Sequence, residues 1–219
     1  MHAVAWLALA LLTTGELEGT HRVRIRDLPD IARPKSRAPT TAELATRHGP
    51  GPDRKLPGGL RITTSCEGTC CVDGLMAGDK ALLAPTVDRD LRDHCDNGWF
   101  ERVVRVAFQD GSAVSIYVAE SWFFDGAAHA HNRLRCRSFD IAKRKPLTLG
   151  DVRPGAAAVR ALAQARRLIR AEPSLHRYAP NAAGIRFRGP RTGKGAQLAL
   201  QFCAEGAEDS VDIVEVDAQ

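Results

Sequence analysis

The sequence predicts an α+β fold in which an antiparallel sheet carries one main helix on one face and disulfides staple the N-terminal part. Two alternating apolar stretches flank an Asp-Gly turn, which indicates a β-hairpin. One amphipathic stretch with helical spacing follows, and further alternating stretches come after it. Strands, then a helix, then strands is an order typical of α+β domains with an antiparallel sheet.

The composition is that of a globular chain with an unevenly placed positive charge. The chain has 219 residues, 44% of them hydrophobic and only 5% aromatic, so the core depends on aliphatic side chains. Residues 21–60 hold nine Lys and Arg against four Asp and Glu, whereas residues 61–219 hold 22 against 20. A basic tail attracts polyanions, but basic residues without interleaved aromatics are poor stacking platforms, so no nucleic-acid partner is expected.

The N-terminal segment predicts export. Residues 1–19 contain a ten-residue apolar run, Ala3 to Leu12, which is typical of a signal peptide and too short to span a bilayer. The alternative is a buried N-terminal helix. Residues 20–59 hold six of the twelve prolines and predict a basic Pro/Gly-rich linker. Residues 60–219 are then the single folded domain, and no membrane span is expected.

Six cysteines behind a leader predict disulfides and a secreted or periplasmic location. They are Cys66, Cys70, Cys71, Cys95, Cys136 and Cys203. A bridge between the adjacent Cys70 and Cys71 is excluded by strain, which leaves 12 complete pairings. We favour Cys136 with Cys203 and two bridges among the other four. Zinc held by four thiolates is the alternative for those four, but the spacing differs from the usual knuckles, so neither a metal nor a cofactor is expected.

Five strands and two helical segments are expected before residue 172. Leu60 to Ser65 forms a short strand, and Val87 to His94 is a polar segment compatible with a helix. The clearest hairpin joins Phe100–Phe108 to Ala113–Phe124. In its first strand Val104, Val106 and Phe108 share one face, since side chains alternate. The remaining expected elements are a half-solvated strand at Arg133–Phe139, a short extended piece at Leu147–Leu149 and the main helix at about Gly155–Glu172.

The main helix begins after Asp151, which we expect to cap it. Its core-facing stripe is Val159, Leu162, Ala165 and Ile169, and its arginines lie mostly off that stripe. Three further strands are expected at Gly184–Arg188, Ala196–Cys203 and Val211–Val216.

Residues 122 to about 170 contain a series of short motifs, namely Trp122-Phe123-Phe124, Gly126-Ala127-Ala128-His129, Phe139-Asp140, Lys143-Arg144-Lys145, Leu147-Thr148-Leu149 and Asp151. With these motifs the segment resembles an extracytoplasmic domain of unknown function shared by RsiV-type anti-sigma factors and PdaC-type peptidoglycan deacetylases. Two glycines of that family's pattern are replaced here, and the cysteines are not part of it. The resemblance implies a module that binds at the cell envelope, as the anti-sigma factor recognises lysozyme, and it supplies no catalytic residues.

The segment around Asp125 is the densest polar cluster and the expected binding site. We place Trp122, Asp125, His129 and His131 in it, with a cell-envelope protein of the lysozyme type or peptidoglycan as partner. The alternative is a metal-dependent hydrolase, because His129 and His131 point to the same side of an extended segment and Asp125 or Asp140 can add a carboxylate. Spacing fixes no third ligand, and the sequence has no G-x-S-x-G elbow, phosphate loop or dinucleotide fingerprint. The chain is therefore expected to be a binding domain and not an enzyme.

Overall fold

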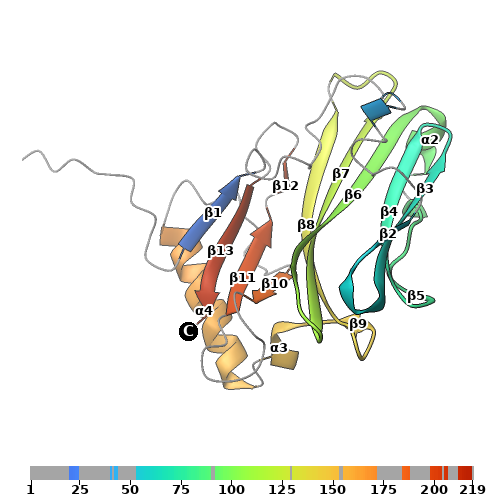
Figure 1. Ribbon diagram of the computed structural model, residues 1–219. Coiled ribbons are helices and arrows are strands. Elements are labelled where there is room, and N and C mark those ends of the chain that lie inside the picture. Colours follow the sequence, from blue (N-terminus) through green and yellow to red (C-terminus); the bar gives the residue numbers. More distant parts are fainter. Residues whose placement is uncertain are drawn as a thin grey trace, which may run out of the picture.

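The computed structural model describes residues 20–24, 40, 42–43, 53–89, 92–128, 130–152, 155–171, 184–187, 198–203, 205–206 and 212–218. The expected signal peptide lies outside these residues. The described part forms two sheets and one long helix, α4, Ala156–Ala171 (Figure 1). Within the expected linker, Thr20–Arg24 and Asp53–Lys55 are strands.

The larger sheet has nine strands, in the order β12-β8-β7-β6-β4-β3-β2, with β5 on β4 and β9 on β8. Its strands are β2 (Asp53–Lys55), β3 (Leu60–Glu67), β4 (Cys70–Ala77), β5 (Lys80–Leu83), β6 (Gly98–Gln109), β7 (Ala113–Phe124), β8 (His131–Asp140), β9 (Lys145–Pro146) and β12 (Glu205–Gly206). The 3₁₀ turn η2 (Pro57–Gly59) precedes β3, and the short helix α2 (Asp93–Asp96) precedes β6.

The smaller sheet has four antiparallel strands in the order β1-β13-β11-β10. They are β1 (Thr20–Arg24), β13 (Asp212–Ala218), β11 (Leu198–Cys203) and β10 (Gly184–Phe187). The three C-terminal strands expected from the sequence are confirmed, with ends that differ by a few residues. The smaller sheet lies between α4 and the larger sheet (Figure 1).

The expectation of a purely antiparallel sheet is wrong at one position, because β4 pairs with β6 in parallel, Cys70 opposite Phe100. The chain returns from the end of β4 through β5 and α2 before β6 begins, and such a long connection is what parallel pairing requires. The helix prediction is also corrected: α4 packs at the C-terminal side, where Ala165 and Ile169 share a core with Leu200 of β11 and Val216 of β13.

The hairpin of β6 and β7 is confirmed, with a bulge that the alternation did not predict. Val106 lies opposite Ile116, but Phe108 lies opposite Ser115, so Ala107 is an extra residue. A one-residue insertion turns the following side chains to the other face of a strand. Phe108 therefore packs against the core that α4 shares with the smaller sheet, whereas Val106 packs against the core of the larger sheet.

The expected helix stripe and cap each need one correction. Val159 is 69% exposed, and the buried residues of α4 are Ala161, Ala165 and Ile169. Asp151 belongs to the separate short helix α3 (Leu149–Val152), where its carboxylate accepts hydrogen bonds from the N–H and the hydroxyl of Thr148 at 2.8 and 2.7 Å. This is the geometry of a capping box, so Asp151 stabilises the start of α3.

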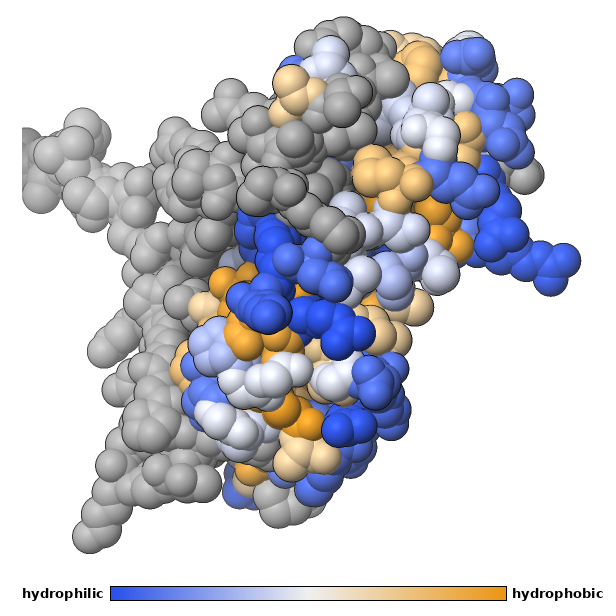
Figure 2. All heavy atoms as spheres, turned by 45° about the vertical axis from the view of Figure 1, so that its right-hand side comes forward, coloured by the Kyte–Doolittle hydropathy of each residue, from blue (hydrophilic) through white to orange (hydrophobic). Residues whose placement is uncertain are grey.

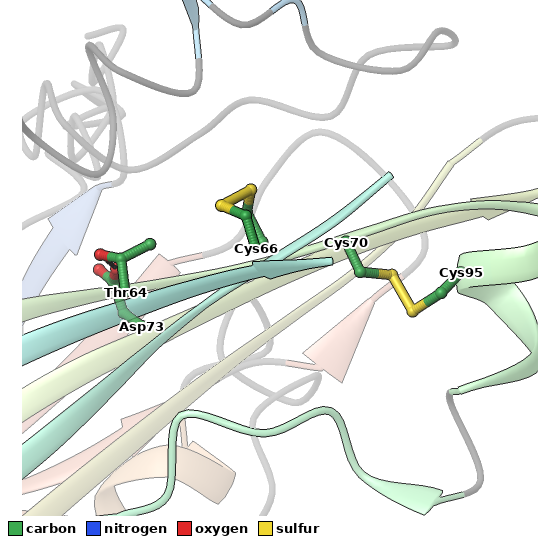
Figure 3. Close-up of a disulfide and its surroundings, with 6 residues drawn as sticks. Thr64, Cys66, Cys70, Asp73 and Cys95 are labelled. Carbon is green, nitrogen blue, oxygen red and sulfur yellow. Dashed lines mark hydrogen bonds between the residues drawn. A yellow bond between two sulfur atoms is a disulfide. The ribbon is translucent and has the colours of Figure 1, made fainter. Parts of the chain in front are cut away.

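The cysteine-rich segment is a β-hairpin formed by β3 and β4. Cys66 and Cys71 are opposite one another in β3 and β4 and form one bridge, and a second bridge joins Cys70 to Cys95 of α2 (Figure 3). Neighbouring side chains of a strand point to opposite faces, which is why Cys70 and Cys71 serve different bridges. Cys136 is also disulfide-bonded. The side chain of its expected partner, Cys203, lies outside the described part, so that pairing stays a prediction.

The described surface carries no large hydrophobic area. Among the described residues the exposed large hydrophobic side chains are Phe124 and Val159. On the face in Figure 2, hydrophobic residues appear as small patches among hydrophilic ones. Among the described helices, none has the length and apolarity needed to cross a membrane.

Candidate functional site

Two adjacent strands, β7 and β8, bring aromatic and charged side chains to one face of the larger sheet. The pairing of β7 with β8 puts Trp122 opposite His131 and Glu120 opposite Arg133, without a shift in register. Because alternate residues share a face, these side chains continue the row that begins in the core with Val114, Ile116 and Val118. We name this surface the arginine–aromatic face. It consists of Glu120, Trp122, Phe124, His131, Arg133, Arg135 and Arg137.

The outer end of this face is a stack of aromatic rings. The imidazole of His131 stacks on the Trp122 ring, with centroids 5.6 Å apart, and on the Phe124 ring, with centroids 5.8 Å apart. The guanidinium of Arg133 lies 5.6 Å from the centroid of the Trp122 ring, within the range of a cation–π interaction. Phe124 is 37% exposed, so the stack presents apolar ring surface to solvent.

Next to the stack, one buried carboxylate holds two arginines. Glu120 is 2% exposed and accepts hydrogen bonds from Arg133 Nε at 2.7 Å and from Arg135 Nη2 at 2.7 and 3.0 Å. Arg102 of β6 lies 4.0 Å from the same carboxylate. Burial acts to lower the pKa of Arg135, but Glu120 and Asp88 together raise it above its ordinary value. These charge-assisted bonds fix the guanidinium groups in place.

Residues 84–89, the crossing segment, run over this face. Arg102 holds the segment by donating to the carbonyl oxygens of Ala84 and of Thr86, the latter at 3.1 Å. The segment passes so close to β4 that a Cβ at Gly74 would lie 2.6 Å from the nitrogen of Pro85. Its Val87 packs beside Trp122 against the cluster of Cys70, Val72 and Phe100. The Cys70–Cys95 bridge anchors the chain directly after the crossing segment.

The structure brings two of the four expected site residues together, since Trp122 and His131 are cross-strand partners in contact. Asp125 is exposed in the following turn, where Ala127 N–H donates to Phe124 O at 3.0 Å and Gly126 has a φ of 93°. That positive φ favours glycine at the third position of the turn. His129 lies outside the described residues.

The metal-dependent hydrolase gains no support from this geometry. In the described ranges, no group of three or more His, Cys, Asp or Glu side chains is placed to hold a metal ion. Asp140, one of the two expected carboxylates, is at the far end of β8 from His131, about 30 Å along the strand. Its carboxylate accepts a hydrogen bond from the N–H of Lys143 at 2.8 Å, so it closes the turn after β8.

Sequence reasoning missed Glu120, Arg133 and Arg135 as site residues. Their signal was present, because Glu120 interrupts an apolar strand and arginines occupy alternate positions of the next strand. A carboxylate at the centre of a buried strand needs a partner, and alternating arginines on an adjacent strand can provide one.

A second basic surface lies along α4. A groove of about 750 Å³ is bordered by one side of this helix. Its lining residues include Arg160, Gln164, Arg166, Arg167 and Arg170, and no acidic residue occurs within α4. This groove is separate in sequence from the arginine–aromatic face.

Comparison with known proteins gives distant structural similarity and no match in sequence. No protein-family model matches the chain, and no curated protein matches it. A solved structure of a DUF3298 family protein from Pseudomonas aeruginosa PAO1 is similar, with 19% sequence identity and a TM-score of 0.41. The similarity covers 69% of this chain and 84% of that chain. The specific relation to RsiV-type and PdaC-type proteins stays a prediction.

Proposed function

We propose that this chain is an extracytoplasmic, non-catalytic binding domain that holds a cell-wall glycan against the arginine–aromatic face. The observation that supports it most is the stack of Trp122, His131 and Phe124 with the guanidinium of Arg133 beside it. Flat apolar rings pack against the apolar faces of sugars, and nearby guanidinium groups donate hydrogen bonds to sugar oxygens. Disulfides within the β3–β4 hairpin and between β4 and α2 support an oxidising compartment.

The small exposed apolar area favours a glycan over a protein partner. A stable protein interface buries about 800 Å² on each partner around an apolar core. In the described part, the arginine–aromatic face offers Phe124 as its exposed large hydrophobic residue, and Val159 is on α4. A single exposed ring suits a sugar chain, whose contacts with a protein are narrow. A lysozyme-type envelope protein is the competing partner in the test below.

The test is co-sedimentation of the purified domain with insoluble peptidoglycan. Phe124→Ala removes exposed ring surface without opening the core, and we expect it to weaken binding about five- to tenfold, because an aromatic contact contributes about 1 kcal/mol. Val159→Ala removes an exposed apolar side chain elsewhere and should leave binding unchanged. A wild-type domain that stays in the supernatant, or a Phe124→Ala variant that sediments like wild type, contradicts the proposal. Capture of lysozyme instead identifies a protein partner.

A further inference from the structure

The guanidinium of Arg137 is partly buried, and no ion pair in the described part of the chain offsets the cost of that burial. It lies half-buried on β8, opposite Ile116 of β7 and two residues from Arg135. Within the described part of the chain its guanidinium makes no hydrogen bond and no ion pair. Burial first, and then the charge of Arg135, lower its pKa. A guanidinium that is partly desolvated beside a like charge is destabilised unless an anion joins it.

Asp88 is a weakly held anion at the same place. It lies on the crossing segment with its side chain 46% exposed, 3.4 Å from Arg135 and 4.0 Å from Arg133. These distances exceed those of a good charge-assisted hydrogen bond, and Asp88 reaches the arginines from the solvent side. Around it, the four guanidinium groups of Arg102, Arg133, Arg135 and Arg137 are near three carboxylates, those of Glu120, Asp88 and Asp73. Of these, Asp73 is already paired with a further arginine, Arg54. The cluster therefore carries surplus positive charge.

We propose that Arg135 and Arg137 form a carboxylate-binding subsite, that the ligand of the arginine–aromatic face is an acidic oligosaccharide, and that Asp88 occupies the subsite in its absence. This inference rests on the proposed function. Planar guanidinium groups bind carboxylates through paired hydrogen bonds, and Arg135 already offers one partly used guanidinium beside Arg137. His131 and Arg135 are four residues apart, about 13 Å along the strand, so a ligand that reaches both the stack and the subsite is longer than one sugar.

Two matched tetrasaccharides test the subsite by titration calorimetry at low salt. One alternates N-acetylglucosamine with glucuronate, and the other is the neutral tetramer of N-acetylglucosamine. We expect the acidic ligand to bind about tenfold tighter, which is the effect of one charge-assisted contact. Arg137→Gln should abolish this difference in affinity between the acidic and the neutral ligand. Asp88→Asn should strengthen binding of the acidic ligand severalfold, because the internal competitor is lost.

Arg160→Gln is the charge-matched control, since it removes an exposed arginine from α4. Equal affinities of the wild-type domain for the two tetrasaccharides overturn the inference. So does an Arg160→Gln variant whose affinity for the acidic tetrasaccharide falls as much as that of Arg137→Gln. Weaker acidic binding in Asp88→Asn also overturns it, and that exposed variant is informative even if Arg137→Gln fails to fold. If the neutral tetramer binds and Phe124→Ala weakens it, the proposed function stands without the subsite. If neither tetrasaccharide nor peptidoglycan binds, both proposals fail.

Discussion

Replacing Glu120 by glutamine should strongly destabilise the domain. The substitution keeps the volume but removes the charge that Arg133 and Arg135 share, and it leaves Arg102 nearby without its carboxylate. Removing one partner of a buried ion pair costs about 3–5 kcal/mol. Arg133 and Arg135 have side chains 24% exposed and can turn partly towards water, so we expect the lower end, about 3 kcal/mol. That is a large fraction of the roughly 5–15 kcal/mol by which domains of this size are stable.

Urea unfolding with the disulfides intact measures this effect, because urea does not screen charges as guanidinium salt does. With a slope of about 2 kcal/mol/M, the midpoint should fall by about 1.5 M. Asp53→Asn is the control, since it breaks an exposed contact of 3.9 Å with Arg61 and should cost less than about 1 kcal/mol. A Glu120→Gln midpoint within about 0.5 M of the control midpoint would refute the reasoning that Glu120 holds this face together.

Three further predictions concern the disulfides, a glycine and a carboxylate. Replacing Cys70 and Cys95 by alanine should cost about 3.5 kcal/mol of stability, because their bridge closes a loop of 25 residues. Replacing Cys66 and Cys71 should cost about 2 kcal/mol, because that bridge closes only 5 residues. Urea unfolding of the two double variants shows which loses more stability. Gly98→Ala should cost about 2–3 kcal/mol of stability and displace the end of the hairpin, since a Cβ there would lie 1.9 Å from a carbonyl oxygen of β7. Thermal melting measures the loss of stability, and weaker peptidoglycan binding indicates the displacement. The pKa of Asp151 is lowered, mainly by the hydrogen bond from Lys145. Because the pKa is lower in the folded state, the stability that this carboxylate contributes is complete above its ordinary pKa of 3.8 and is lost as the pH falls below that value. Melting curves from about pH 5 to pH 2 should therefore fall less steeply for Asp151→Asn, and equal slopes would contradict this.

The parts of the fold that the sequence predicts are those with local causes. The hairpin follows from alternation around an Asp-Gly turn, and Asp110 indeed accepts hydrogen bonds from the N–H groups of Ser112 and Ala113, both at 2.7 Å. Helix α4 follows from its spacing of apolar residues, although the exposed position of Val159 depends on which side the smaller sheet covers. Local patterns identify these elements because each is specified by its own residues.

The parts that the sequence does not predict depend on contacts between distant segments. The expected polar cluster around Asp125 lies at the edge of the arginine–aromatic face. The centre of that face is Glu120, whose partners are on another strand. Residues 84–89 reach this face only because β4 pairs with β6 in parallel, and no local pattern specifies that pairing. The face of Phe108 depends on a single extra residue, Ala107, which alternation alone does not reveal.

The pairing of β1 with β13 has a consequence for the order in which the chain acquires its structure. Thr20 lies opposite Val216, so this pair joins residues that are far apart in the sequence. Contacts of such large sequence separation form late, because most of the loop between them must first be closed. During synthesis, β1 cannot pair with β13 until the chain has been made as far as residue 218. The smaller sheet is therefore the part of the molecule that a truncated or stalled chain cannot complete, whereas the hairpin of β6 and β7 can form from its own residues alone.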